Sequence, residues 1–465
     1  MQEIFEPTLE FAQRKDREDE LQGFRSRFFI PSSPAQEASP SKIDRLASQP
    51  SHKASSSKID RSFERSLLER SLPGTEEAIY FLGNSLGLQP RSVEASIRQE
   101  LEDWRELAIG GYLHARNPWM TYQLPFRSPL SKIAGCLEEE VTVMNALTVN
   151  LHLLLLSFYH PLPSRYKIIM EAGAFPSDQY AAETQVKWHG YDPNQAIIEI
   201  RPRAGEKIIR EEDILSVIDQ HKDSLSLVLL GGINYYTGQL FDIRLITEAA
   251  HRAGALAGFD LAHAIGNVPL QLHDWGVDFA VWCSYKYLNG GPGAVGGAYL
   301  HEKYARDKDF VRLGGWWGND EASRFRMEKG FIAKPNADGW NMSTAQVFNM
   351  VSLKASLAII EEAGIGRMQS KSKELTAYLY FLLQSPGIKG GNIRFQVITP
   401  AEPQRRGAQL SLYFEERSKE IHQQMTDAGI IVDYREPGVI RAAPAPLYNS
   451  FEEVYRFYHI LEQFH

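Results

Sequence analysis

The chain has 465 residues, of which 43% are hydrophobic and 23% charged, a balance typical of a water-soluble protein of two or three domains. A formal net charge of −8 argues against a nucleic-acid partner, which favours a basic face. Two cysteines, no basic leader and no apolar run near the roughly 20 residues of a membrane span predict a cytoplasmic protein without a membrane partner.

Residues 1–76 are expected to form an N-terminal helix followed by a Ser/Pro-rich insertion. The helical pattern covers residues 5–29, and residues 31–75 are rich in serine, proline and basic residues. The tract Ser41–Arg45 recurs as Ser57–Arg61, which indicates a local duplication in a loop. With few large apolar side chains to bury, residues 31–75 are predicted to be a surface insertion, with a docking or phosphorylation segment as the alternative.

Residues 77–345 alternate between strand-like and helical patterns. This alternation indicates βαβ units, and therefore a large α/β domain with a mainly parallel sheet. Helices are expected at Glu211–His221 and Ile243–Ala253. The strand-like runs are Lys167–Met170, Ala196–Ile200, Leu225–Leu230, Ala255–Phe259, Val277–Cys283 and Val295–Leu300.

Residues 346–465 predict a smaller C-terminal α+β domain. A long helical stretch, Ala345–Ala363, leads into it, and its last helix is expected at Phe451–Gln463. Its strands are expected at Ile393–Ile398, Gln409–Phe414 and Ile430–Tyr434.

Three polar side chains follow two of the predicted strands. Asp260 and His263 come after Ala255–Phe259, and Lys286 comes after Val277–Cys283. Because ligands of parallel sheets bind at the carboxyl ends of strands, these side chains are expected to share one site. A lysine amine can bind the aldehyde of pyridoxal phosphate (PLP), and an acid can keep its pyridine nitrogen protonated. The set therefore predicts PLP, whereas a lone strand-end lysine is usually solvated.

Two neighbouring segments fit such a cofactor. Thr148 precedes the helical run Val149–Phe158, so it is expected to cap that helix and to hold a phosphate there, with an ordinary helix cap as the alternative. Phe175 follows the strand Lys167–Met170 and is expected to lie on the cofactor ring, with a core anchor as the alternative.

Other cofactor and nucleophile motifs do not fit. Gly291–Gly296 matches G-x-G-x-x-G, but it leads into a strand, whereas a dinucleotide fingerprint must lead into a helix. The sequence has no H-E-x-x-H or C-x-x-C motif, so no dedicated metal site is expected, and it has no G-x-S-x-G elbow of a serine hydrolase.

Several longer segments closely resemble kynureninase, a family of fold-type-I PLP hydrolases. The resemblance runs from about Glu77 to the C-terminus and implies hydrolysis of L-kynurenine to anthranilate and L-alanine, in tryptophan catabolism and NAD biosynthesis. Whether 3-hydroxy-L-kynurenine is also a substrate stays open. The matching segments are Tyr80–Gly87, Met144–His152, Phe175–Asp178, Gly258–Gly266, Asp274–Asn289 and Arg441–Asn449.

The resemblance also implies residue roles. Lys286, Asp260 and Tyr236 would be catalytic, with Tyr236 a candidate proton carrier. Trp316 and Thr344 would reach the site of a second copy, which implies a homodimer with shared active sites. The residues expected to bind the cofactor are Leu147, Thr148, Phe175, Pro176, Ser177, Asp178, Asp260, His263, Tyr285, Lys286, Trp316 and Thr344.

Substrate contacts are expected from Ser85, Tyr112 and Arg441. A bidentate guanidinium suits the substrate α-carboxylate, which is the role implied for Arg441. Animal members have His and Asn at the positions of Tyr112 and Thr344, and those side chains can bind the extra hydroxyl of the hydroxylated substrate. Because this chain has Tyr112 and Thr344 in their place, we expect it to prefer kynurenine over 3-hydroxykynurenine.

Two alternatives remain open. A cysteine desulfurase needs a nucleophilic cysteine on a mobile loop, whereas Cys283 falls in a predicted strand and Cys136 at a helix end. A PLP-site relic that serves as a scaffold is disfavoured by the intact Lys286, Asp260 and His263.

Overall fold

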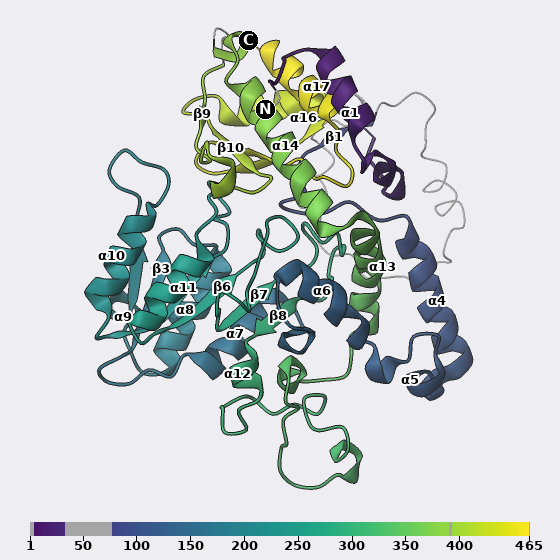
Figure 1. The fold of residues 1–465 in the computed structure, drawn as a ribbon, viewed down its shortest axis with the longest axis vertical. Coiled ribbons are helices and arrows are strands. Elements are labelled where there is room, and N and C mark those ends of the chain that lie inside the picture. Colours follow the sequence, from purple (N-terminus) through teal and green to yellow (C-terminus); the bar gives the residue numbers. More distant parts are fainter. Residues whose placement is uncertain (1–3, 33–76, 390–392, 465) are drawn as a thin grey trace, which may run out of the picture.

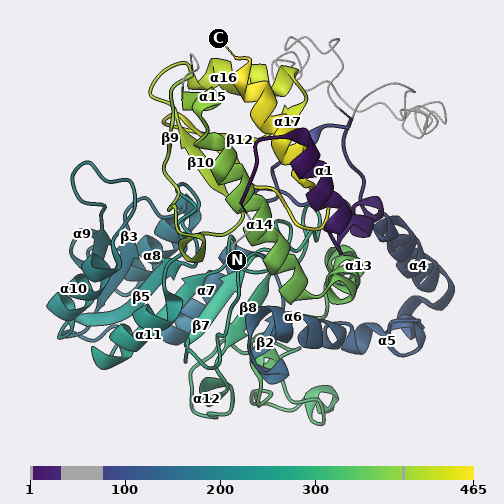
Figure 2. The same ribbon diagram turned by 45° about the horizontal axis from the view of Figure 1, so that its top comes forward.

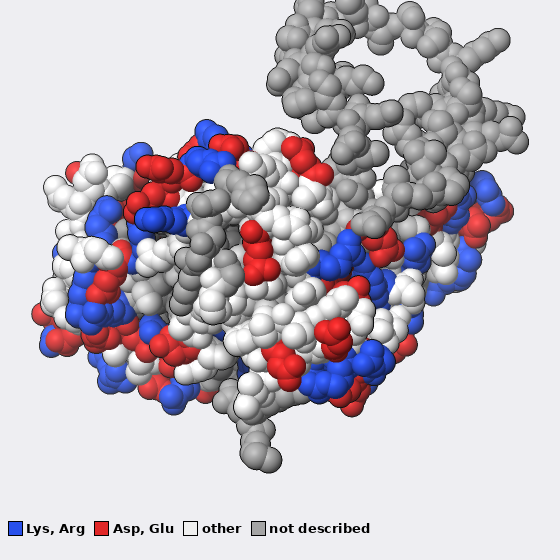
Figure 3. All heavy atoms as spheres, turned by 90° about the horizontal axis from the view of Figure 1, so that it is seen from above, with Lys and Arg blue, Asp and Glu red and all other residues white. Residues whose placement is uncertain are grey.

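The computed structural model describes residues 4–32, 77–389 and 393–464 (Figure 1). Almost all of the predicted insertion at residues 31–75, including its duplicated tract, lies outside these ranges. Among the described residues, no helix is both long and apolar enough to span a membrane. Acidic and basic side chains are interspersed on the face shown in Figure 3.

A seven-stranded sheet in the order β2-β8-β7-β6-β5-β3-β4 forms the centre of the larger lobe. Strands β3 to β7 pair in parallel, and β8 runs antiparallel to both of its neighbours. The predicted α/β fold with a mainly parallel sheet is therefore confirmed. The strands are β2 (Val141–Val143), β3 (Lys167–Glu171), β4 (Ile197–Ile200), β5 (Leu225–Gly231), β6 (Leu256–Asp260), β7 (Phe279–Trp282) and β8 (Gly297–Leu300).

Helices cover both faces of this sheet, which explains why its strands are apolar on both sides. Alternate side chains of β3 point to opposite faces, so Ile168 joins the core beneath α7 and α8, and Ile169 joins the core beneath α10 and α11. The helices of this lobe are α4 (Ser92–Leu107), α5 (Gly111–His114), α6 (Arg127–Ala134), α7 (Leu147–Phe158), α8 (Pro176–Trp188), α9 (Pro193–Ala196), α10 (Glu211–His221), α11 (Ile243–Arg252), α12 (Glu302–Ala305) and α13 (Val347–Ala363).

The smaller lobe is built on a four-stranded sheet in the order β12-β13-β10-β9. Its strands are antiparallel, and a separate parallel pair joins β1 to β11. The elements are β1 (Ile79–Tyr80), β9 (Gln396–Val397), β10 (Leu410–Tyr413), β11 (Ile430–Ile431), β12 (Asp433–Arg435), β13 (Val439–Ala442), α1 (Leu9–Glu18), α14 (Ile365–Leu383), α15 (Pro386–Lys389), α16 (Ser418–Asp427) and α17 (Phe451–Glu462).

The two ends of the chain meet in this smaller lobe. Figure 2 shows α1 lying against α17, and the Asp16 carboxylate accepts hydrogen bonds from the first two amides of α17, at 2.7 Å from Phe451 N and 2.9 Å from Glu452 N. A carboxylate at the positive end of a helix stabilises it. Phe11 and Phe81 join the same core, so N-terminal residues complete the smaller lobe.

Candidate active site

The carboxyl ends of three neighbouring strands form the floor of a cavity of about 150 Å³. Glu171 ends β3, Gly231 ends β5 and Asp260 ends β6, and the loop after β7 brings Lys286 over them. The sheet topology therefore brings together the two strand ends predicted from sequence. The cavity is lined by Leu147, Thr148, Glu171, Phe175, Ser177, Asp178, Gly231, Ile233, Tyr235, Asp260, Ala262, His263, Cys283, Tyr285 and Lys286.

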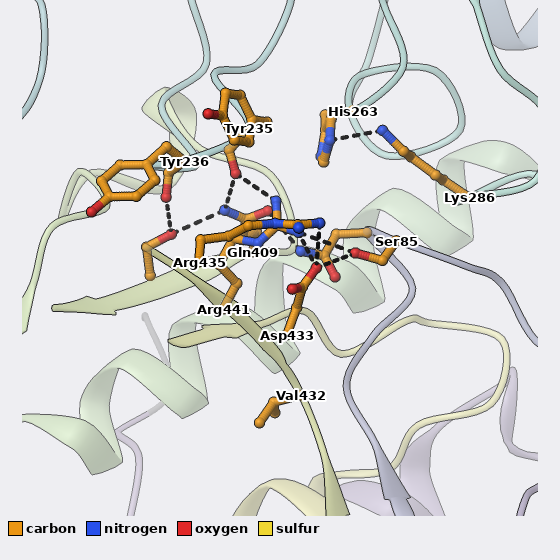
Figure 4. Close-up of polar contacts among 12 residues, drawn as sticks. Ser85, Tyr235, Tyr236, His263, Lys286, Gln409, Val432, Asp433, Arg435 and Arg441 are labelled. Atoms are coloured by element: carbon orange, nitrogen blue, oxygen red, sulfur yellow. Dashed lines mark hydrogen bonds and ion pairs between the residues drawn. The ribbon is translucent and has the colours of Figure 1, made fainter. Parts of the chain in front are cut away.

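Lys286 is almost fully buried beside a neutral imidazole. Its Nζ lies 2.9 Å from Nε2 of His263 (Figure 4). Burial, reinforced by the charge of Lys286, lowers the pKa of His263 well below its usual range. His263 is thus held as an acceptor for the lysine ammonium. Its Nδ1 is buried and has no hydrogen-bond partner among the described residues.

Three carboxyl groups, those of Glu171, Asp178 and Asp260, also line the cavity. Burial raises the pKa of Asp178 well above its usual range, and its carboxyl hydrogen-bonds to Asp260. Burial also raises the pKa of Asp260, but Lys286 and the amide of Ala262, at 2.7 Å, act in the opposite direction. Asp260 is therefore the acid whose charge is best compensated, with Asp178 as its hydrogen-bond donor.

The N-terminus of α7 faces the cavity with its amides uncapped. The helix begins at Leu147 after Ala146, and no side chain caps it. The prediction that Thr148 is the N-cap is therefore wrong: Thr148 lies within the first turn, because the extended residue that precedes the helix is Ala146. Leu147 and Thr148 both line the cavity, where free amides at the positive end of a helix favour an anion.

Phe175 closes another side of the cavity, just before α8. Its ring is 43% exposed and meets the ring of Tyr235 edge-on at 5.3 Å, so it is not a core anchor. Pro176 is the first residue of α8, and Ser177 and Asp178 follow in its first turn. The helix start thus carries Ser177 and Asp178 to the cavity.

An ion-pair cluster around the buried Arg441 adjoins this cavity from the smaller lobe (Figure 4). The guanidinium of Arg441 donates to the carbonyl of Tyr235 at 2.7 Å, to Ser85 Oγ at 3.1 Å and to the Asp433 carboxylate. Asp433 also accepts from Ser85 and, at 3.0 Å, from Arg435. Ser85 and Arg441, both predicted substrate contacts, therefore lie in contact with each other.

The remaining predicted residues lie outside the cavity lining, except Tyr285, whose ring centroid is 6.0 Å from Lys286 Nζ. The hydroxyl of Tyr236 donates to the carbonyl of Pro437 at 3.1 Å. Tyr112, on α5, packs edge-on against Trp119. Trp316 and Thr344 lie apart from the cavity of their own chain, and Trp316 is 48% exposed.

Glu171, Tyr235 and Asp433 are site residues that sequence reasoning missed. Glu171 directly follows the predicted strand Lys167–Met170, just as Asp260 follows Ala255–Phe259, so its position at a strand end could have indicated it. Asp433 lies directly opposite Arg441 in the antiparallel β12–β13 pair. The turn at Pro437-Gly438 could have indicated this pairing.

The residues present fit PLP. The lysine amine suits its aldehyde, the uncapped start of α7 suits its phosphate, and Asp260 suits its pyridinium nitrogen. The unpartnered Nδ1 of His263 is a buried polar atom with capacity for one more hydrogen bond.

Comparisons with known proteins identify the family and the fold of this chain. Residues 368–461 match the family model of the kynureninase C-terminal domain. The fold resembles a solved structure of C-DES with glycine covalently linked to PLP, with a TM-score of 0.70 at 16% identity over 88% of this chain and 100% of that one. A cysteine desulfurase from Thermococcus onnurineus is similar, with a TM-score of 0.68 at 19% identity over 88% of this chain and 99% of that one. These neighbours confirm the predicted PLP-enzyme fold.

Relatives in sequence are much closer. The kynureninase of Myxococcus xanthus is 46% identical over 459 residues, which cover 99% of this chain and 98% of the relative. The kynureninase of Nematostella vectensis is 44% identical, covering 97% of this chain and 93% of the relative. Identity of this level along nearly the whole of both sequences shows that the chain belongs to the kynureninase family of PLP-dependent hydrolases.

Proposed function

We propose that the residues around Lys286 hydrolyse L-kynurenine to anthranilate and L-alanine. The observation that carries this proposal is the placement of a buried lysine between a neutral histidine and a compensated aspartate, beside the uncapped start of a helix. Lys286 would hold the cofactor aldehyde, Leu147 and Thr148 its phosphate, and Asp260 its ring nitrogen, with Phe175 against the ring. When bound, PLP supplies an electron-accepting ring that stabilises negative charge at the substrate α-carbon.

The proton chemistry falls to side chains that lie close to Lys286. Its free amine is the base proposed to remove the α-proton, and His263 Nε2, at 2.9 Å and neutral, can accept the hydrogen bond of the resulting ammonium. Tyr236 stays the predicted proton carrier for the later carbon–carbon cleavage. Burial raises the pKa of its hydroxyl to about 12, so at neutral pH it is a proton donor.

Arg441 is proposed to bind the substrate α-carboxylate. Its guanidinium is buried and lies next to Ser85, and a planar fork of donors matches a carboxylate. Preference for kynurenine over 3-hydroxykynurenine stays a prediction from Tyr112 and Thr344. Neither lies in the cavity lining of its own chain, so this preference depends on an assembled site.

We also propose that the protein is a cytoplasmic homodimer with two shared sites. Trp316 is a large apolar side chain left half exposed outside its own cavity, which supports a role in the site of a second copy. Two unpaired cysteines, Cys136 and Cys283, suit a reducing compartment.

The similarity to a desulfurase structure concerns the fold alone. A desulfurase nucleophile must be accessible and ionised, whereas burial raises the pKa of Cys283, which lies against the site. Burial likewise raises the pKa of the Cys136 thiol, which lies outside the cavity lining. The desulfurase alternative therefore lacks a nucleophile among the described residues.

The test combines the cofactor bond with turnover. Protein loaded with PLP and reduced with borohydride should carry a pyridoxyl label on the peptide that contains Lys286. The protein should hydrolyse kynurenine to anthranilate with a higher kcat/KM than it hydrolyses 3-hydroxykynurenine to 3-hydroxyanthranilate. The Lys286→Ala variant should lose the label and nearly all turnover. Labelling of another lysine would overturn the role of Lys286, and labelling without turnover would favour a PLP-site relic.

A further inference from the structure

A cluster of two histidines and a glutamate lies at the edge of the seven-stranded sheet opposite to Lys286. Glu140 immediately precedes β2, and His301 immediately follows β8, whose last residue pairs with the first residue of β7. His273 lies in the loop that leads into β7. The cluster is thus at the amino-terminal edge of β7, whereas the proposed catalytic site is at the carboxyl ends of the strands.

The potential ligand atoms converge on one point. His273 Nδ1 lies 3.0 Å from both carboxylate oxygens of Glu140, and His301 Nδ1 lies 3.5 Å from Glu140 Oε1. All three ligand atoms lie within 4.8 Å of one another. Tetrahedral Zn²⁺, with bonds of about 2.0–2.2 Å to nitrogen and oxygen, places its ligand atoms roughly 3.3 Å apart. The two distances from Glu140 lie on either side of that value.

The carboxylate at the centre of the cluster is held in place by the backbone. Glu140 is fully buried and accepts hydrogen bonds from the amide of Leu137 at 3.0 Å and from that of Glu302 at 2.8 Å. The histidines form the open side, because the side chains of His273 and His301 are 30% and 16% exposed. An ion could therefore enter from solvent and keep a water as its fourth ligand.

A second observation marks the same place. Tyr299 is fully buried, and its hydroxyl has no hydrogen-bond partner in the described part of the chain. Tyr299 pairs with Val141, the residue after Glu140. A buried hydroxyl without a partner, on the strand next to a buried carboxylate, has capacity for a hydrogen bond to a further polar group at this place.

We propose that Glu140, His273 and His301 form a site for one Zn²⁺ ion that joins β2, the end of β8 and the loop before β7. The positive charge of Lys303, two residues after His301, is compensated by an ion pair with Asp278 at 2.8 Å. Ligand binding replaces the hydrogen bond between His273 Nδ1 and the Glu140 carboxylate, at 3.0 Å, and gives up the weak hydrogen bond from the amide of Lys303 to His301 Nδ1, at 3.3 Å. The ion stabilises the sheet edge and takes no part in the reaction at Lys286.

The test is Zn²⁺ titration of PLP-loaded protein that has been freed of metal with a chelator. Calorimetry and elemental analysis should show one Zn²⁺ per chain, and the ion should raise the midpoint of thermal unfolding. His273→Ala should weaken binding by more than the roughly 10- to 100-fold that the loss of an outer-shell partner costs. His301→Asn, which can still cap α12, is a second variant in case the first does not fold.

His251→Ala is the matched control. His251 is also a partly exposed imidazole on a buried carboxylate, with its Nε2 2.8 Å from Asp278, but it lies outside the cluster. The control should bind Zn²⁺ as the unmodified protein does. The proposal is overturned if the unmodified protein takes up no stoichiometric Zn²⁺, or if whichever of His273→Ala and His301→Asn folds binds it as tightly as the control does.

Discussion

Asp433 positions the guanidinium that is proposed to bind the substrate. It faces Arg441 across the β12–β13 pair and also binds Arg435 at 3.0 Å. Asp433→Asn keeps the shape but removes the charge, so Arg441 loses a charge-assisted bond of roughly 1.5–3 kcal/mol. We expect KM for kynurenine to rise about tenfold or more with a smaller change in kcat. Steady-state kinetics checks this.

The control for Asp433→Asn is Asp427→Asn, at the exposed end of α16. A lower KM in Asp433→Asn would contradict the prediction. It would show that Asp433 competes with the substrate carboxylate for Arg441.

Glu171 should make stability depend on pH. Burial raises the pKa of this carboxyl from its ordinary 4.5 to about 7. Between those values the folded chain keeps a proton that the unfolded chain has lost, so stability falls as pH rises through the window, by on the order of 3 kcal/mol. Glu171→Gln should remove this fall in urea unfolding of cofactor-free protein. Glu183→Gln, on an exposed part of α8, should retain it.

An unchanged pH dependence in Glu171→Gln would assign the proton to another buried acid. Asp178 would then be the first candidate, since burial raises the pKa of its carboxyl as well.

Single residues could be predicted where a pattern fixes their position along the chain. Asp260 and Lys286 follow strand-like runs, and the edge of a parallel sheet brings such ends together. Asp433 could not be predicted from the sequence because its role depends on a cross-strand partner. The cluster of two histidines and a glutamate could not be predicted because Glu140 and His273 are 133 positions apart. Spacing motifs detect ligands on one element, not ligands that tertiary structure assembles.

The loop that carries Lys286 is supported by Gly87, which lies in a loop distant in sequence. Gly87 N donates to the carbonyl of Tyr285 at 2.8 Å, and a Cβ at Gly87 would lie 2.2 Å from Asn289 Oδ1 and 2.4 Å from the carbonyl oxygen of Lys286. We expect Gly87→Ala to displace this loop and weaken PLP binding by roughly tenfold or more, the effect of a strained backbone contact of about 1–3 kcal/mol. Cofactor titration of the apoprotein measures this.

The control is Gly366→Ala. Gly366 lies in α14, where an added Cβ meets no atom within 4 Å. Alanine there should leave cofactor affinity unchanged. Equal affinity in Gly87→Ala would show that the loop adapts without losing the position of Lys286.

Elements were predicted well where one periodicity continues to the end of the segment. The helix Glu211–His221 has the predicted bounds, because its apolar positions recur at helical spacing. The predicted strand Ile430–Tyr434 is wrong as a single element, since it divides into β11 and β12. The apolar pattern could not indicate this division, because β11 pairs with β1 and β12 with β13, in two different sheets.

At the scale of the whole molecule, a single chain leaves Trp316 and Thr344 outside its own cavity. Trp316 contacts Trp317 and Phe325 edge-on, and neither Trp316 nor Thr344 lines the cavity around Lys286. In the predicted homodimer, both residues would reach the site of the neighbouring subunit. Closed two-fold symmetry then gives each dimer two composite sites, each with the lysine of one chain and the tryptophan of the other.

Hybrid dimers test this arrangement. Lys286→Ala and Trp316→Ala should each be nearly inactive, yet a hybrid has one site with both defects and one site with neither. Equal mixing yields hybrids as half of all dimers, so recovered activity should approach about one quarter of the unmodified level. Mass-tagged chains establish that subunits have exchanged before kynurenine turnover is measured. Exchange without recovery would place Trp316 in the site of its own chain, and recovery would require that each site be built by two chains.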